Sequence, residues 1–235
     1  MRTSVITMIF LAASLSMLSA DSTEEALYRE VLSKTFTSAK MPAVRKLAEL
    51  RTRAAEECLK RLMNDDDMWN SESGVNGLLL LKRESSARIL FDGLMRGGIT
   101  AGRIEEGLKK DPVFYRTMAA ERYRTLLADD SSDDGVRSVL LSIIAASGDE
   151  QFIRNIAAVQ TSRDRDSAFN IYIRHFSKTG DAFIRGQLAD PGLRISVLNY
   201  IAHTGTKNDL PLFRDIAAKN GSPAEERMIA HTAIH

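Results

Sequence analysis

The feature that most constrains the fold is a repeat of about 30 residues in the second half of the chain. Four segments align with one another: VLLSIIAASG at 139–148, AFNIYIRHFS at 168–177, SVLNYIAHTG at 196–205 and AEERMIAHTA at 224–233. They start 29, 28 and 28 residues apart, and one column holds an isoleucine in every copy: Ile144, Ile173, Ile201 and Ile229. A chain with this period stacks copies of one small unit, because each unit buries its apolar side against the next.

A second motif follows each of the first three copies: DEQFIRNIAA, DAFIRGQLA and DLPLFRDIAA. Its first residue is Asp149, Asp181 or Asp209, placed where a helix needs an N-cap oxygen. Apolar residues then recur at helical spacing. Residues 131–235 are therefore predicted to form an all-α solenoid, in which each repeat is a pair of antiparallel helices.

Residues 21–130 show helical periodicity but no visible repeat. We expect helices at Thr23–Ala39 and Pro42–Met63, in an irregular helical region that continues into the solenoid. The polar run DDSSDDG at 129–135 predicts the boundary between this region and the repeats.

The first twenty residues, MRTSVITMIFLAASLSMLSA, have the pattern of a secretory signal. Arg2 precedes an apolar run that is too short for a membrane span, which needs roughly 20 apolar residues, and small residues follow it. We expect cleavage after Ala20 and a periplasmic or secreted protein without a stable membrane span. The alternative is that the segment is not cleaved and anchors the protein in the membrane.

The paired helices, the short period and the spacing from aspartate to arginine in the second motif resemble HEAT-like repeats. The closest resemblance is to the armadillo-like type of about 30 residues found in phycobilisome lyases. The resemblance implies a right-handed superhelix, and proteins of this family mostly bind other proteins. It also implies that the aspartates form a structural ladder with three arginines, Arg154, Arg185 and Arg214.

Histidines occupy one column of the alignment, His175, His203 and His231, and His235 lies one helical turn beyond the last of them. Imidazoles at i and i+4 can share a metal ion, so His231 and His235 are weak metal candidates. Metal-binding HEAT-like enzymes use His-Glu pairs, whereas phenylalanine or threonine follows each column histidine here. The helical wheel places the column near the outward face, beside the tyrosines. Repeat duplication therefore explains these histidines better than a metal site does.

Arg154, Arg185 and Arg214 lie one per unit, opposite the apolar side of their helices. Stacked at unit spacing on a concave face, they could grip carboxylates or phosphates of a partner. In the alternative, each arginine pairs with an aspartate of its own or the neighbouring unit.

Composition narrows the function further. The formal net charge is +1, which argues against nucleic acid as the partner, and the single cysteine, Cys58, excludes an intramolecular disulfide. No nucleophile, phosphate-loop, dinucleotide or zinc-protease motif occurs, so we expect no catalysis and no cofactor. The sequence predicts an exported scaffold that holds a protein or peptide partner, and the arginine column would suit an acidic one. The alternatives are a metal-binding protein or enzyme that uses the C-terminal histidines, and a self-associating component of the cell envelope.

Overall fold

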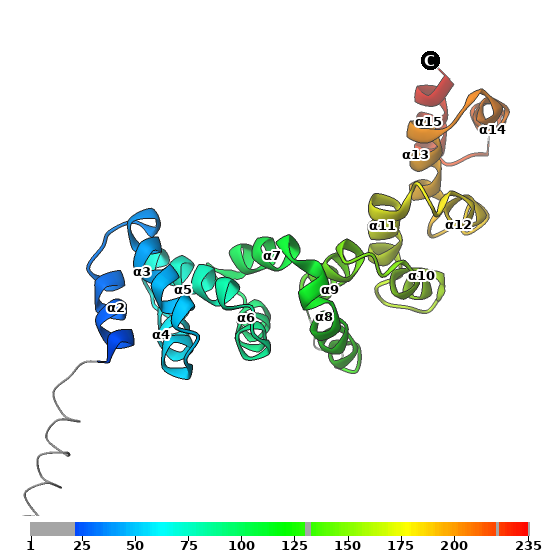
Figure 1. Ribbon diagram of the computed structural model, residues 1–235. Helices are drawn as coiled ribbons and strands as arrows, with labels where there is room; N and C mark the ends of the chain where they lie inside the picture. Colours follow the sequence, from blue (N-terminus) through cyan, green and yellow to red (C-terminus); the bar gives the residue numbers. More distant parts are fainter. Residues whose placement is uncertain (1–21, 130–132, 220, 235) are drawn as a thin grey trace, which may run out of the picture. The chain divides into compact units, whose positions relative to one another are not determined.

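The computed structural model describes residues 22–129, 133–219 and 221–234. Within these residues the chain forms α-helices and one short 3-10 helix, and it forms no strand (Figure 1). The predicted all-α fold class is confirmed. The chain divides into two compact units, Met1–Lys110 and Asp111–His235, each with its own helix stack.

The first unit is built from successive helix pairs. Its described helices are α2 (Thr23–Leu32), α3 (Thr37–Leu50), α4 (Arg53–Met63), α5 (Met68–Leu81), α6 (Glu84–Arg96) and α7 (Ala101–Lys110). Helix α4 packs against α2, while α5 packs against both α3 and α7. First helices and second helices thus form separate rows, as in a solenoid, and this region has the same construction as the repeats.

The period of about 30 residues also extends through the first unit. The first helices begin after Ser22, Thr52 and Arg83, which are 30 and 31 residues apart. Hydrogen bonds link consecutive first helices at the same interval: Thr52 Oγ1 lies 2.8 Å from Glu24 Oε1, and Ser85 Oγ lies 2.6 Å from Glu56 Oε1. The repeat escapes sequence comparison because packing requires apolar character at each position, and not one particular residue.

The prediction of one helix at Thr23–Ala39 is wrong, because α2 ends at Leu32 and a new helix, α3, begins at Thr37. Lys40, which is 2 % exposed, explains the break. Its Nζ donates to the carbonyl oxygens of Val31, at 2.9 Å, and Lys34. The ammonium therefore binds the carbonyl groups at the end of α2, where a longer helix would have continued.

The prediction of one helix at Pro42–Met63 is also wrong, because these residues belong to two helices. Helix α3 starts at Thr37 and accommodates Pro42 early in its length, and it ends at Leu50, because the next residue, Arg51, is left-handed with a φ of 52°. Thr52 then caps α4, with Oγ1 3.0 Å from the backbone nitrogen of Ala55. A left-handed residue followed by an N-cap side chain separates two helices sharply.

The second unit contains the repeats recognised in the sequence. Its described helices are α8 (Pro112–Leu127), α9 (Asp134–Ala146), α10 (Glu150–Ala158), α11 (Arg165–Phe176), α12 (Asp181–Gly186), α13 (Arg194–Thr204), η1 (Lys207–Asp209), α14 (Leu210–Ala218) and α15 (Ala224–Ile234). Among the first helices, α9 packs against α11, and α13 packs against α15. Each of the second helices α10, α12 and α14 contacts the first helix that follows it.

The isoleucine column is the core of this stack. Ile144, Ile201 and Ile229 are buried, and Ile173 is half-buried. The column before it is also buried at Tyr172 and Tyr200, so the tyrosines face inward.

The division between the compact units falls between Lys110 and Asp111, whereas composition predicts a boundary in the polar run at 129–135. Helix α8, which precedes that run, packs against α9 after it. Within the run, Asp133 caps α9, with Oδ1 2.7 Å from the backbone nitrogen of Gly135. The second unit therefore contains the helices on both sides of the run.

Candidate functional site

The predicted binding residues lie on the second helices of the second unit. Arg154 is on α10, Arg185 on α12 and Arg214 on α14. Each directly follows a buried apolar residue: Ile153, Ile184 and Phe213 are at most 2 % exposed. Because one residue turns a helix by about 100°, burying these side chains directs the next side chain away from the core. The three arginines consequently occupy equivalent positions, as the sequence predicts.

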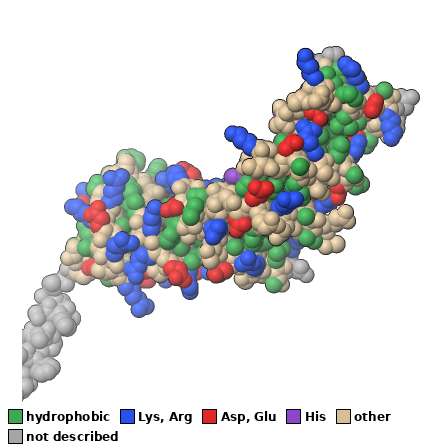
Figure 2. All heavy atoms as spheres, turned by 45° about the vertical axis from the view of Figure 1, so that its right-hand side comes forward, with side chains coloured by type: hydrophobic (Ala, Val, Ile, Leu, Met, Phe, Trp, Pro, Cys, Tyr) green, Lys and Arg blue, Asp and Glu red, His purple; other side chains and the backbone are tan. Residues whose placement is uncertain are grey.

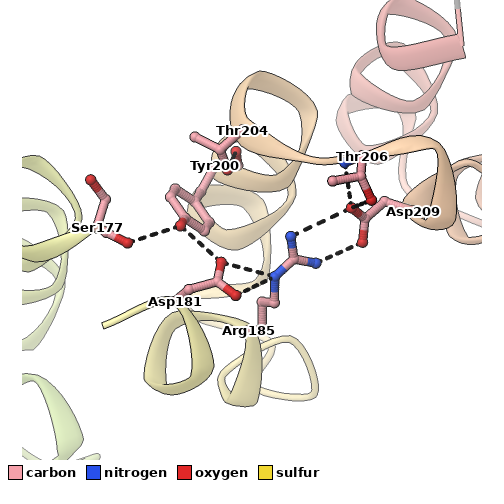
Figure 3. A network of polar contacts seen from close by, with 7 residues as sticks. All are labelled: Ser177, Asp181, Arg185, Tyr200, Thr204, Thr206 and Asp209. Atoms are coloured by element: carbon pink, nitrogen blue, oxygen red, sulfur yellow. Dashed lines mark hydrogen bonds and ion pairs between the residues drawn. The ribbon is translucent and has the colours of Figure 1, made fainter. Parts of the chain in front are cut away.

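Arg185 is engaged within the chain (Figure 3). Its Nε lies 2.9 Å from both carboxylate oxygens of Asp181, one turn earlier on α12. Its terminal nitrogens lie 2.6 Å and 3.4 Å from the oxygens of Asp209, at the start of α14 in the next helix pair. The Tyr200 hydroxyl, from α13, lies 2.9 Å from Asp181 Oδ1. One guanidinium therefore joins two consecutive helix pairs.

The charges of this network are mutually stabilised. Hydrogen bonds from Arg185, and then from the Thr206 backbone N–H, hold the pKa of Asp209 below its ordinary value. Hydrogen bonds to Asp209 and Asp181 raise the pKa of Arg185. Burial, followed by the bond to Asp181, raises the pKa of Tyr200. Arg185 thus forms the intramolecular ladder that the sequence offered as the alternative to ligand binding.

Arg154 has a different environment. Its side chain is exposed, and its guanidinium carbon lies 4.8 Å from the centre of the Phe183 ring on α12. Such stacking holds the guanidinium flat while its N–H groups stay in solvent. The neighbouring carboxylate, Glu150, accepts a hydrogen bond of 2.6 Å from Tyr172. Burial, and then this bond, raise the pKa of Tyr172 to about 12.

Arg214 is exposed on α14, and no described residue forms an ion pair or hydrogen bond with it. Arg154 and Arg214 are thus open to a partner on either side of Arg185, which the structure already uses. The candidate site therefore consists of two available arginines, not three.

Only one of the three predicted caps acts as an N-cap side chain. Asp149 Oδ1 lies 3.2 Å from the backbone nitrogen of Phe152. Asp181 is the first residue inside α12, after Gly180, so the prediction that it caps the helix is wrong. Asp209 precedes α14 but instead closes the 3-10 turn, with Oδ2 2.8 Å from the Thr206 nitrogen. Both carboxylates turn toward Arg185, which satisfies them with charged bonds.

A second arginine series was missed in the sequence. It lies at the starts of the first helices, and each member pairs with a carboxylate from a following element. The pairs are Arg137 with Asp164, Arg165 with Asp190, and Arg194 with Glu226. The arginines are 28 and 29 residues apart, so the repeat period could have revealed them. They lie two or three residues before the start of the segments that align in the sequence.

The first pair of this series is buried. Arg137 is 0 % and Asp164 is 4 % exposed. Arg137 Nε lies 3.0 Å and 2.9 Å from the two oxygens of Asp164, and the Tyr123 hydroxyl donates to Asp164 Oδ2 at 2.9 Å. These side chains join α8, α9 and the start of α11. Their burial assigns them to the core and not to a binding surface.

The column histidines do not converge. His175, His203 and His231 are exposed, and His203 Nδ1 lies 2.7 Å from the carbonyl oxygen of Asn199 on its own helix. His235, the second weak metal candidate, lies outside the described residues. Among the residues that the structure describes, no three histidine, cysteine, aspartate or glutamate side chains are placed to hold a metal ion together.

Residues 1–20, which the sequence predicts to be a secretory signal, also lie outside the described residues. Of the helices that are described, none combines the length and the apolar character needed to cross a membrane. Basic and acidic side chains are interspersed on the face shown in Figure 2, in keeping with the near-zero net charge.

Comparison with known proteins gives a distant likeness to a solved structure. No family model matches the sequence, and no curated protein matches it. Among solved structures, the chain is similar to the complex of CpcE and CpcF of phycocyanin lyase from Nostoc sp. PCC7120. The identity is 15% and the TM-score 0.37, over 92% of this chain and 88% of that chain. This neighbour is of the helical-repeat type that the sequence resembles. A likeness at this level transfers neither activity nor partners.

Proposed function

We propose that this protein is an exported helical-repeat scaffold that binds an acidic segment of a partner protein on the second helices of its second unit. One observation carries the proposal: Arg154 and Arg214 are exposed at equivalent positions, and no described carboxylate pairs with either. Arg185, between them in the series, is locked to Asp181 and Asp209. The two available arginines thus lie on helices of a stack in which Arg185 links α12 to the start of α14.

The spacing favours a polypeptide over a small anion. An α-helix with its side chains is about 10–12 Å wide, so successive second helices repeat at roughly 10 Å, and Arg154 and Arg214, which are two repeats apart, are separated by roughly 20 Å. An extended chain covers about 3.3 Å per residue, so about six residues span the two arginines. A free phosphate or a single amino acid would reach only one of them.

The test uses a synthetic extended peptide of eight residues with glutamates near both ends, labelled for fluorescence anisotropy. We expect saturable binding to the full chain. Arg154→Ala with Arg214→Ala should weaken it about tenfold, because two exposed charge pairs together contribute about 1.4 kcal/mol. Arg185 stays intact so that the fold is preserved.

The matched control is Arg174→Ala with Lys178→Ala, which removes the same charge from exposed residues on and directly after α11. Equal affinity of both double variants would contradict the proposal, because binding would then follow net charge alone. A two-residue peptide that binds as tightly as the eight-residue peptide would contradict the bridging of the two arginines.

Export is the second part of the proposal, and it is supported by Arg2, the apolar run and Ser19-Ala20. Expression of the full chain in a bacterial host, followed by fractionation and N-terminal sequencing, tests it. We expect a periplasmic protein that begins at Asp21. Full-length protein in the cytoplasm would contradict export, and full-length protein in the membrane would show an uncleaved anchor.

A further inference from the structure

The first unit exposes a group of large apolar side chains where its helix pairs turn. Phe36 is 58 %, Met68 40 % and Ile99 73 % exposed, and Trp69 is half-buried. Phe36 precedes α3, Met68 and Trp69 begin α5, and Ile99 precedes α7. Members of this group, which we call the apolar loop patch, therefore come from corresponding positions of all three helix pairs in the described part of the unit.

One ring contact and one shared cleft link members of the patch. The rings of Phe36 and Trp69 meet edge to face, with centroids 5.9 Å apart. Met68, which precedes Trp69 in the chain, and Ile99 both line a cleft of about 370 Å³. Exposed apolar surface of this kind, which contains aromatic residues and methionine, is typical of interaction sites.

The turn before Ile99 contributes to the exposure of this side chain. Gly97 and Gly98 have φ values of 71° and 91°, which only glycine adopts without strain. The chain therefore reverses sharply after α6 and leaves Ile99 outside the core. Because Ile99 stays exposed, its apolar surface contributes little to the free energy of folding. A partner that covers this side chain would remove that surface from water, which favours binding.

The charges around the cleft determine the chemistry of the partner. Asp65 and Asp66 line it, and no described residue pairs with the exposed carboxylate of Asp66. One basic residue, Arg96, also lines the cleft; it donates to neutral oxygens, at 2.9 Å to Asn64 Oδ1 and at 3.4 Å to the Asp92 carbonyl, and it keeps its positive charge. The two carboxylates outnumber this single cation, so the net charge of the cleft lining is negative.

We infer that the apolar loop patch binds a segment of a partner protein that carries apolar side chains on one face and lysine or arginine beside them. The apolar face covers Phe36, Met68 and Ile99, and the basic groups meet Asp65 and Asp66. Anionic lipid does not fit, because these carboxylates repel its headgroups. The site is independent of the arginines of the second unit, and it selects the opposite charge.

The test exploits Trp69, because it is the single tryptophan of the chain and belongs to the patch. The probe is a synthetic helical peptide of leucine and lysine, with leucine on one face and no aromatic residue. Binding to the full chain should move the Trp69 emission to shorter wavelength with saturation, because water is displaced from the ring. An analogue with glutamate in place of lysine should produce no shift.

Variants locate the binding surface. Ile99→Ser and Met68→Ser should each raise the dissociation constant about tenfold, and Asp65→Asn with Asp66→Asn should raise it at least about threefold. The matched control is Leu80→Ser, since Leu80 is 50 % exposed in the same unit but lines another cleft. All these side chains are exposed or at the surface, so circular dichroism should remain unchanged.

Four results with the unmodified protein would overturn the inference. They are no saturable shift with the lysine peptide, an equal shift with the glutamate analogue, an equal shift with phosphatidylglycerol vesicles, and a shift on concentrating the protein alone. The last result would show that a second copy of the chain covers the patch. Loss of binding in Leu80→Ser to the same extent as in Ile99→Ser would overturn it as well.

Discussion

Substitution of Asp164 should lower the free energy of unfolding of the second unit more than substitution of an exposed residue nearby does. Asp164 is 4 % exposed, and it neutralises the fully buried Arg137 through both carboxylate oxygens. Taking away one partner of a buried ion pair costs about 3–5 kcal/mol, because the other charge is left without compensation. Arg137 keeps a bond to the exposed Asp134, so we expect Asp164→Asn to cost near the lower end, about 3 kcal/mol.

Urea unfolding followed by circular dichroism measures this cost. With a urea dependence of about 2 kcal/mol per molar, 3 kcal/mol lowers the midpoint of the second unit by about 1.5 M. Tyr123→Phe removes one hydrogen bond from the same carboxylate and should cost about 1 kcal/mol. Trp69 fluorescence reports on the first unit in the same samples.

The matched control is Asp166→Asn, two residues further on, where the side chain is exposed. A midpoint for Asp164→Asn that equals the control would refute the reasoning, because the buried pair would then contribute nothing beyond surface charge. Replacing both partners, with Arg137→Met and Asp164→Leu, should recover much of the loss, since no buried charge remains. A double variant as unstable as the single one would show that packing, and not charge, is responsible.

Two further predictions concern packing and pH. A Cβ at Gly74 would lie 2.2 Å from the backbone nitrogen of Met63, so Gly74→Ala should force α4 and α5 apart. We expect the free energy of unfolding, followed by Trp69 fluorescence, to fall by more than about 2 kcal/mol. The control is Gly102→Ala, which should leave the stability of the protein unchanged because open space surrounds Gly102. The pKa of Tyr172 is raised to about 12, so the stability that its hydroxyl contributes is present below the unfolded pKa of about 10 and is lost as pH rises through 12. The difference in urea midpoint between wild type and Tyr172→Phe at pH 8 should therefore shift against wild type between pH 10 and pH 12; a constant difference would contradict the raised pKa of the buried hydroxyl.

Several features of the second unit could be predicted from the sequence. The isoleucine column is the buried core, and Asp149 caps α10 as expected. Arg154, Arg185 and Arg214 do share one position on their helices. These features depend on side chains three or four residues apart, and helix geometry alone fixes their relative directions.

The first unit was less predictable. Its period of about 30 residues is carried by different residues in each pair, so no alignment reveals it. The breaks after Leu32 and at Arg51 depend on the buried ammonium of Lys40 and on a left-handed backbone, and periodicity does not register either feature.

The sequence by itself determined that this chain is a series of short helices in repeating pairs, because apolar spacing and helix caps act within one turn of the chain. Only the tertiary structure decided what each arginine does. The partners of Arg185 and Arg137 include residues 24 and 27 positions away, and the same residue type is a ladder, a buried ion pair or an open surface group according to which neighbour stacking brings beside it. Stacking also assembled the apolar loop patch, whose residues come from three separate turns of the chain.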